Sequence, residues 1–147
     1  PEVDARWAQM RRDARRSPSP ATRARHIIID STKADRRKGR ETVLTEAFVV
    51  DQITKPCHYC ADTEAQMTLD RIDNALGHTE DNVVPSCFRC NVARGAMPYA
   101  AWMLLTPGMR QAREQGLFGE WDGRTAGNTR KPVHPLAGII PARQSAS

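Results

Sequence analysis

The first 40 residues combine short apolar groups with arginines at helical spacing. This pattern predicts a basic helix over residues 3–16, which ends at the Ser-Pro-Ser-Pro run of residues 17–20. A second basic helix is predicted over residues 21–38, with Gly39 as its C-terminal stop. Basic residues crowd the last turn of this second helix, where cations interact favourably with the helix dipole. The N-terminal part is therefore predicted to be helical and basic.

A short helix is predicted after Thr45, because threonine caps helix N-termini well. Phe48, Val49 and Ile53 share one side of this helix, and Pro56 closes it. Residues 65–73, AQMTLDRID, alternate as a strand does. Residues 74–82 read as a loop, residues 82–85 as a short extended piece, and residues 86–95 as a turn that leads into a helix. These elements predict a small α+β core.

Two further helices are predicted toward the C-terminal end. Residues 98–105, PYAAWMLL, begin with proline and are apolar, as expected of a packing helix. Residues 107–118 supply a short amphipathic helix, and the residues after Trp121 show no periodicity. We divide the chain into basic helical arms (1–40), a core (41–106), a C-terminal helix (107–121) and an extended or disordered tail (122–147).

Composition and charge change this picture in two ways. Apolar residues make up 39% of the chain and aromatic residues 5%, so burial alone is a weak source of stability and a metal staple becomes plausible. The net charge is +5, but residues 1–40 hold 12 Lys or Arg against 5 Asp or Glu. A basic block of this kind suits a polyphosphate partner, and a solvated, solubilising arm is an equally good interpretation.

The four cysteines form two C-x-x-C pairs, Cys57 with Cys60 and Cys87 with Cys90. Two-residue spacing lets both thiolates of a pair reach one ion, and two such pairs complete the tetrahedron of a structural zinc site. Two unrelated reduced pairs are the plain alternative, and an iron–sulfur cluster would use the same ligands. Zinc is favoured because nothing else in the sequence indicates electron transfer. A site with four cysteines has no free coordination position, so any chemistry must lie elsewhere.

The sequence contains no apolar signal segment before the cysteines, which disfavours a secreted, disulfide-bonded domain. The longest apolar stretches are also far short of a membrane span. We therefore expect an intracellular, reducing location and no membrane partner.

The residues that indicate a reaction lie between the cysteine pairs and directly after the second pair. Asp70 is on the predicted strand and Asn91 at the start of the helix after the last cysteine, so a zinc ion would draw them together. Carboxylate and amide oxygens suit a Mg²⁺ ion that takes its remaining ligands from water and phosphate. Such an ion can assist hydrolysis of a phosphodiester bond when a neighbouring base activates water.

The string CHYC…LDRIDNALGHTEDNVVPSCFRCNVARG, over residues 57–95, resembles the HNH endonucleases of the His-Me finger (ββα-metal) group, particularly the phage-type proteins. The resemblance implies a zinc-stapled ββα core and one catalytic divalent ion, Mg²⁺ or Mn²⁺. It also implies that Asp70 and Asn91 bind that ion and that Asn82 orients the finger through hydrogen bonds. We therefore expect a metal-dependent endonuclease acting on DNA.

Arg71 departs from the family pattern, because it occupies the position of the general-base histidine and stays protonated. Three explanations fit. His78 serves as the base from the loop; Asp73 activates water while Arg71 grips the scissile phosphate; or hydrolysis has been lost and only nucleic-acid binding remains. Plain structural roles also fit these residues: Asp73 as a turn residue, His78 as a satisfied loop residue and Asn91 as a helix cap.

Affinity for DNA is expected to come mainly from the arms, because an HNH core is small. Phosphate contacts position a protein without reading sequence, so weak sequence preference follows. The alternative to the nuclease is a catalytically degenerate HNH-fold subunit of a larger nucleoprotein complex, and a phage-encoded chain would work in the cytoplasm of a bacterial host. The residues predicted to contact nucleic acid are Arg12, Arg16, Arg23, Arg36, Arg37, Lys38, Arg89 and Arg94.

Overall fold

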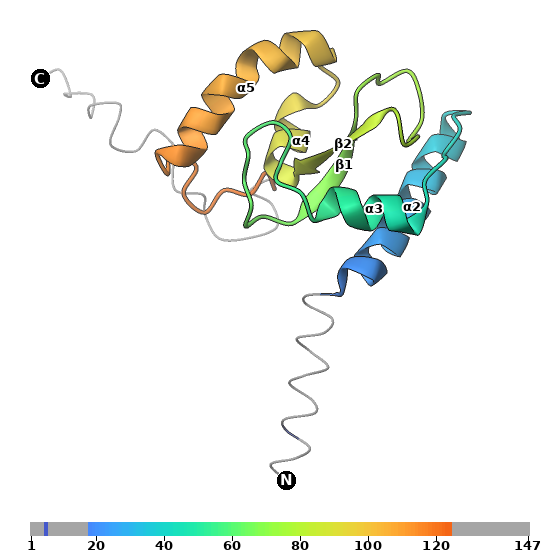
Figure 1. Ribbon diagram of the computed structural model, residues 1–147. Coiled ribbons are helices and arrows are strands. Elements are labelled where there is room, and N and C mark those ends of the chain that lie inside the picture. Colours follow the sequence, from blue (N-terminus) through green and yellow to red (C-terminus); the bar gives the residue numbers. More distant parts are fainter. Residues whose placement is uncertain (1–4, 6–17, 125–147) are drawn as a thin grey trace, which may run out of the picture.

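The computed structural model describes residue 5 and residues 18–124 (Figure 1). Within that part, four helices surround a two-stranded antiparallel sheet, which confirms the predicted α+β class. The helix predicted over residues 3–16, including Arg12 and Arg16, and most of the predicted tail lie outside the described residues. None of the described helices combines the length and apolar character that crossing a membrane requires.

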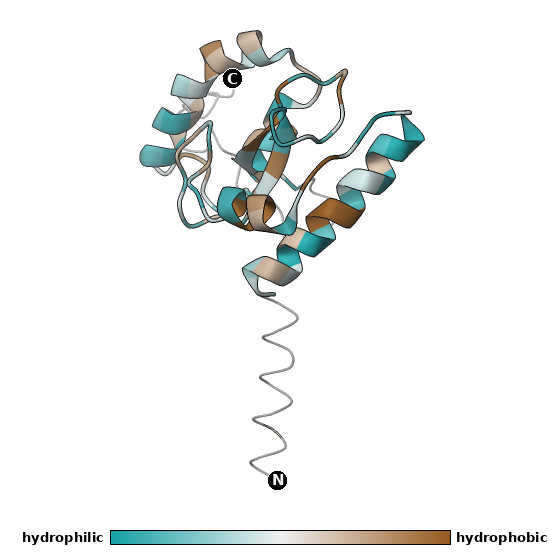
Figure 2. Cartoon of the chain, turned by 45° about the vertical axis from the view of Figure 1, so that its right-hand side comes forward, coloured by the Kyte–Doolittle hydropathy of each residue, from teal (hydrophilic) through white to brown (hydrophobic). Residues whose placement is uncertain are grey.

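Helix α2 (Pro20–Arg37) lies along one side of the molecule and packs against α3 (Glu46–Ile53) (Figure 1). Its first turn is fixed by Ser19, whose hydroxyl accepts a hydrogen bond from the Thr22 N–H, and by Pro20 at the first helical position. The chain leaves the helix through Gly39, whose φ of +65° suits glycine. An apolar band in the middle of α2 separates hydrophilic turns, so the helix buries only part of its surface (Figure 2).

Helix α3 (Glu46–Ile53) begins after Thr45, whose hydroxyl accepts a hydrogen bond from the Phe48 N–H as predicted. Strands β1 (Met67–Arg71) and β2 (Val83–Cys87) pair so that Met67 faces Cys87 and Asp70 faces Val84. Helix α4 (Phe88–Arg94) follows β2 without a loop. The sheet contacts both α3 and α4, so β1 and β2 are covered by helices from two parts of the chain.

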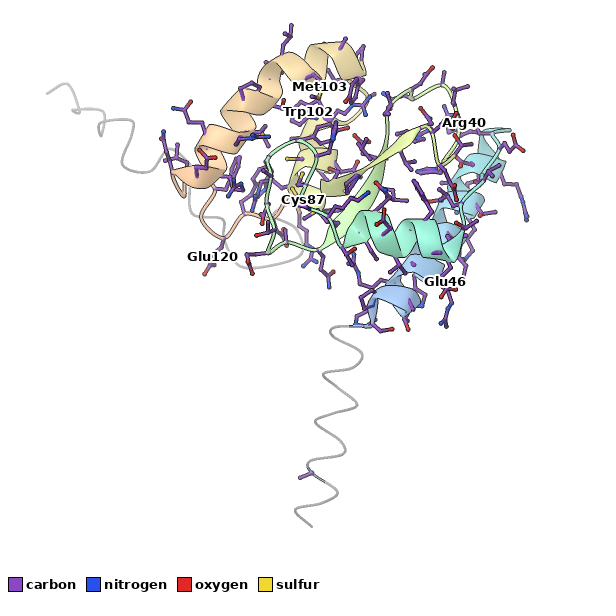
Figure 3. All side chains as sticks on the ribbon, viewed as in Figure 1. Arg40, Glu46, Cys87, Trp102, Met103 and Glu120 are labelled. Carbon is purple, nitrogen blue, oxygen red and sulfur yellow. The ribbon has the colours of Figure 1, made fainter. Side chains whose placement is uncertain are left out.

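The core of the described part is small. Twelve apolar residues are buried, and four of them are the cysteines. The remainder include Val49 and Ile53 of α3, Met67 and Leu69 of β1, and Trp102, which extends from α5 (Tyr99–Glu114) toward the interior (Figure 3). A third of the buried apolar set therefore consists of sulfur ligands, and the fold depends on what those sulfurs bind.

Helix α5 corrects the prediction of two C-terminal helices. It runs without a break over Tyr99–Glu114 and includes Pro107, so it also crosses the boundary drawn between residues 106 and 107. A proline inside a helix leaves the carbonyl four residues earlier without an N–H donor. Here the Thr106 hydroxyl donates to that carbonyl, the Met103 oxygen, at 2.9 Å. This substitute hydrogen bond explains why the helix continues through the proline.

Candidate functional site

The four cysteines form one buried cluster. All four Sγ atoms lie within 4.8 Å of one another, and Cys60 Sγ is 3.8 Å from Cys87 Sγ. Tetrahedral zinc bonds of about 2.3 Å place neighbouring sulfurs about 3.8 Å apart. Cys87 lies at the centre of the molecule among these sulfurs (Figure 3). The cluster can hold one metal ion, and its all-thiolate donor set suits zinc.

The electrostatics of the cluster also favour a cation. Hydrogen bonds from the other thiols, first of all Cys60, lower the pKa of Cys57 far below its usual range. Hydrogen bonding to Cys57 raises the pKa of Cys90 far above it. Sulfurs this close cannot all ionise unless a positive charge lies between them. Backbone N–H groups already point at the sulfurs, from Cys87 to Cys57 at 3.3 Å and from Cys90 to Cys87 at 3.4 Å.

The cluster joins the hairpin to α4, and two polar side-chain pairs bridge β1 and α4 beside it. In the first pair, the Asn91 amide donates to Thr68 Oγ1 at 3.0 Å and to the Leu69 carbonyl at 3.5 Å. In the second, Arg94 Nη1 donates to Asp70 Oδ2 at 2.8 Å. Thr68 and Asp70 are two residues apart in a strand, a separation of about 6.6 Å, and Asn91 and Arg94 are three residues apart in a helix, a separation of about 5–6 Å. The two pairs are therefore neighbours.

Asp70 and Asn91, the two predicted ligands of a divalent ion, therefore lie on adjacent pairs of one interface. Asp70 uses Oδ2 for both of its side-chain hydrogen bonds, from Arg94 and from the Tyr59 hydroxyl at 2.6 Å. Asn91 uses its Nδ2 atom. Among the described residues, neither Asp70 Oδ1 nor Asn91 Oδ1 accepts a side-chain hydrogen bond. Each residue thus keeps one hard oxygen donor.

Arg94 is a fully buried guanidinium, with none of its side chain exposed. Besides Asp70 it donates to the carbonyls of Arg71, Ile72 and Met97. Burial opposes its charge, but the hydrogen bond and negative charge of Asp70 outweigh burial and raise the pKa of Arg94. Burial together with the Asp70 carboxylate raises the pKa of the Tyr59 phenol. Asp70 is therefore held on one side by two groups that remain protonated.

The loop after β1 is braced by Asn82, the residue to which the family resemblance assigns an orienting role. Its Oδ1 accepts from the Asp73 N–H at 2.9 Å, and its Nδ2 donates to the carbonyls of Asp73 and Gly77. Arg71 Nη1 donates to the loop carbonyls of Asn74 and Leu76 at 3.1 and 3.0 Å. Arg71, the residue at the general-base position, therefore binds its own loop in this conformation.

His78 is held by α2. Its Nδ1 lies 2.9 Å from Asp35 Oδ2, and the same oxygen accepts from the His78 N–H and from the Thr42 hydroxyl. Burial disfavours the charge of Asp35, but these hydrogen bonds outweigh it and lower the pKa of Asp35. The ring is 14% exposed. The structure thus ties His78 to α2, whereas Asp70 and Asn91 lie at the interface with α4.

Comparison with known proteins bears on the fold. No protein-family model matches the sequence, and no curated protein matches it. Among solved structures, the rare-cutting HNH restriction endonuclease PacI matches with a TM-score of 0.53. The two chains are 16% identical, and the match covers 63% of this chain and 81% of the PacI chain. The chain has the HNH endonuclease fold. The resemblance seen in the sequence is thereby confirmed at the level of the fold.

The basic residues expected to touch nucleic acid occupy different places in this HNH fold. Arg36, Arg37 and Lys38 are exposed at the C-terminal end of α2, where they remain predicted contacts. Arg23 is half-buried and donates to the Met67 carbonyl at 2.6 Å, which docks α2 on the start of β1. Arg94 corrects the prediction, because its guanidinium is enclosed by Asp70 and three carbonyls and acts inside the site.

Arg89 also has an internal role. Its Nε donates to the Trp121 carbonyl at 3.0 Å, and its guanidinium lies 4.6 Å from the centre of the Phe118 ring. Its Nη1 is 3.6 Å from Asp62 Oδ2. Arg89 thus fastens the segment after α5 to the HNH core, and 14% of its side chain is exposed.

Sequence reasoning missed the polar partners of the site. The hydrogen bond from Tyr59 to Asp70, the burial of Arg94 and the pairing of Asp35 with His78 were not predicted. An aspartate in a basic helix looks like an ordinary surface residue, and an arginine three residues after Asn91 looks like a phosphate contact. Helical spacing was the available signal for Arg94, because positions 91 and 94 share one face of α4.

Proposed function

We propose that this chain is a metal-dependent endonuclease that hydrolyses phosphodiester bonds in DNA. The observation that carries the proposal is the β1–α4 interface, where Asp70 and Asn91 each keep one oxygen without a side-chain partner among the described residues. Two protein oxygens fit a Mg²⁺ or Mn²⁺ ion whose other positions are filled by water and phosphate. When bound, that ion would neutralise negative charge on the phosphodiester and on the leaving oxygen.

The protein residues have distinct tasks in this proposal. The Cys57, Cys60, Cys87 and Cys90 cluster holds a structural zinc ion and fixes the hairpin against α4. Arg94 and Tyr59 hold Asp70 Oδ2, so that Oδ1 is the oxygen left for the divalent ion. Asn82 sets the shape of the loop that carries Asp73.

We assign the proton acceptor to Asp73 and not to His78. Asp73 is exposed in the loop just after β1, three residues after Asp70, and it borders a cavity that Arg94 also lines. Its Oδ1 accepts from the Ala75 N–H, and no described residue donates to its Oδ2. A carboxylate oxygen can accept a proton from water. The ring of His78, in contrast, is engaged with Asp35 on α2.

Nicking of supercoiled plasmid by the zinc-loaded full chain, with Mg²⁺ or Mn²⁺, tests the proposal. Asp70→Asn preserves an acceptor for Arg94 while removing the charge that favours the divalent ion, so we expect nicking to fall by at least about 100-fold. Asn91→Ala and Asp73→Asn should also lose activity. Asp51→Asn, an exposed acidic position on α3, is the matched control and should nick at the parental rate.

Two features favour a second function, DNA binding without cleavage: the arginine at position 71 and the enclosure of Asp70 by Arg94. A degenerate HNH domain that binds DNA without cutting it would show both. Such a protein would shift DNA in a binding assay and leave plasmid supercoiled with either metal. Nicking that persists in Asp70→Asn would instead contradict the assigned site.

A further inference from the structure

A second candidate site lies beside the first, at the opposite end of β1 from the loop. It is a cavity of about 330 Å³, bordered by the start of β1, the start of α4, α2 and the residues after α5. Its lining includes three arginines, one carboxylate and one hydroxyl: Arg23, Arg89, Arg124, Asp122 and Thr68. Thr68 connects the two sites, because its hydroxyl also accepts the hydrogen bond from Asn91.

The arginines retain hydrogen-bond donors that the fold does not use. A guanidinium has five N–H groups. Arg23 donates from Nη2 to the Met67 carbonyl, and within the described residues no carboxylate pairs with it. Burial lowers the pKa of Arg23, as expected of a charge that lacks a counterion. Arg89 Nη1 makes no hydrogen bond in the described part of the chain, although Asp62 Oδ2 lies 3.6 Å from it.

The charge around the cavity is unbalanced toward positive. Asp122 lies 3.4 Å from Arg124, and Asp62 lies 3.6 Å from Arg89. Among the described residues, these two carboxylates pair with Arg124 and Arg89, and none pairs with Arg23. The side chain of Arg124 is 66% exposed at the cavity rim. Arginine side chains bind the oxygens of a phosphate through parallel hydrogen bonds. The arginines come from α2, α4 and the segment after α5, and a phosphate offers more oxygens to donors from separate elements than a carboxylate does.

We propose that this cavity binds a phosphate group of the nucleic-acid strand, next to the phosphate at the Asp70 and Asn91 site. The inference rests on the proposed function for the identity of the ligand, and on the cavity itself for the presence of an anion site. Thr68 links the two sites, because Thr68 and Asp70 are two residues apart in β1 and lie on the same face of the strand. The Thr68 hydroxyl lines the cavity, and the Asp70 carboxylate belongs to the proposed metal site. The strand would thus pass along the edge of the β1–α4 interface and contact both.

Charge-changing variants of opposite sign test the cavity. Arg124→Gln removes an exposed charge and leaves the packing of Arg89 intact. Asp122→Asn removes the negative charge but can keep an acceptor for the Arg124 N–H, which binds Asp122 Oδ1 at 3.0 Å. Arg110→Gln, an exposed arginine on α5 that borders a different cavity, is the matched control.

Binding of a fluorescein-labelled 20-mer DNA to the zinc-loaded full chain is measured by anisotropy over a range of salt, without added Mg²⁺ or Mn²⁺. We expect Arg124→Gln to weaken binding about threefold to tenfold at low salt and to reduce the salt slope by about 0.9 for duplex. Asp122→Asn should tighten binding, and Arg110→Gln should change it less than either.

Equal effects of Arg124→Gln and Arg110→Gln, or weaker binding in Asp122→Asn, would overturn the proposal. Inorganic phosphate separates the two sources of the same chemistry. If phosphate binds in an Arg124-dependent way while the DNA affinity of Arg124→Gln is unchanged, the cavity takes free phosphate and the strand assignment is wrong. Plasmid nicking is measured independently. If the chain does not nick plasmid but Arg124→Gln still weakens DNA binding, only the proposed nuclease activity is refuted. If the chain nicks plasmid and Arg124→Gln does not change DNA binding, only the proposed phosphate site is refuted.

Discussion

Breaking the buried pair between Arg94 and Asp70 is the most demanding test of the site geometry. Both side chains are nearly inaccessible, with exposed fractions of 0% and 9%. Arg94→Met leaves Asp70 with the Tyr59 hydroxyl and removes the donor from three main-chain carbonyls. Removing one partner of a buried ion pair costs about 3–5 kcal/mol of folding free energy. At about 4 °C per kcal/mol, the melting temperature should fall by roughly 12–20 °C.

Substitution of the other partner, Asp70, should cost less folding free energy, because Arg94 makes more hydrogen bonds than Asp70 does. In Asp70→Asn the amide oxygen can still accept from Arg94, and the carbonyls of Arg71, Ile72 and Met97 keep their donor. We expect a loss of about 1–3 kcal/mol. The double variant should be more stable than the sum of the two losses predicts, by about 0.5–3 kcal/mol, since neither buried charge remains.

Urea unfolding followed by circular dichroism measures these differences. Free zinc must be held constant in every sample, because a bound metal adds to apparent stability through mass action. Arg110→Gln serves as the control for loss of an exposed arginine and should stay within about 0.5 kcal/mol of the parent. If Arg94→Met costs less than Asp70→Asn, the guanidinium is not the internal support of Asp70, and the assignment of Asp70 Oδ1 to the divalent ion loses its basis.

Three further outcomes follow from the described contacts. Cys60→Ser should abolish binding of one zinc equivalent, measured by a colorimetric chelator, and the protein should lose cooperative unfolding, because zinc binding supplies much of the folding free energy of a small metal-stapled domain. Gly77→Ala should destabilise the protein strongly, since the new Cβ would lie 1.8 Å from a main-chain oxygen. Gly108→Ala, in an exposed helical turn with nothing within 4 Å, should raise the melting temperature slightly. A similar response to both variants would refute the close approach at Gly77. The pKa of Asp35 is lower in the folded protein than in the unfolded chain, so its contribution to folding stability is present above the unfolded pKa and is lost as pH falls through the folded pKa. Asp35→Asn should therefore flatten the acid limb of a curve of stability against pH. An unchanged acid limb would contradict the His78 contact.

Local sequence was a good guide wherever one short-range rule decides the outcome. Thr45 caps α3 because its hydroxyl reaches the N–H three residues on, and Gly39 ends α2 because a positive φ is easy for glycine. The same rules failed at Pro107. The helix continues there because the Thr106 hydroxyl replaces the missing donor, a contact that no propensity scale includes.

The sequence by itself determined the cysteine cluster, the α+β class and the approach of Asp70 to Asn91. C-x-x-C spacing acts over a few residues, so it can be recognised without coordinates, whereas the loop-free passage from β2 into α4 replaced the predicted turn. Only the tertiary structure decided which atoms of those residues are available. The pairing of Asp70 with Arg94 and Tyr59, and of His78 with Asp35, spans 11 to 43 residues along the chain. Such partners are set by how buried charges find counter-charges when the elements pack, and sequence spacing does not encode that choice.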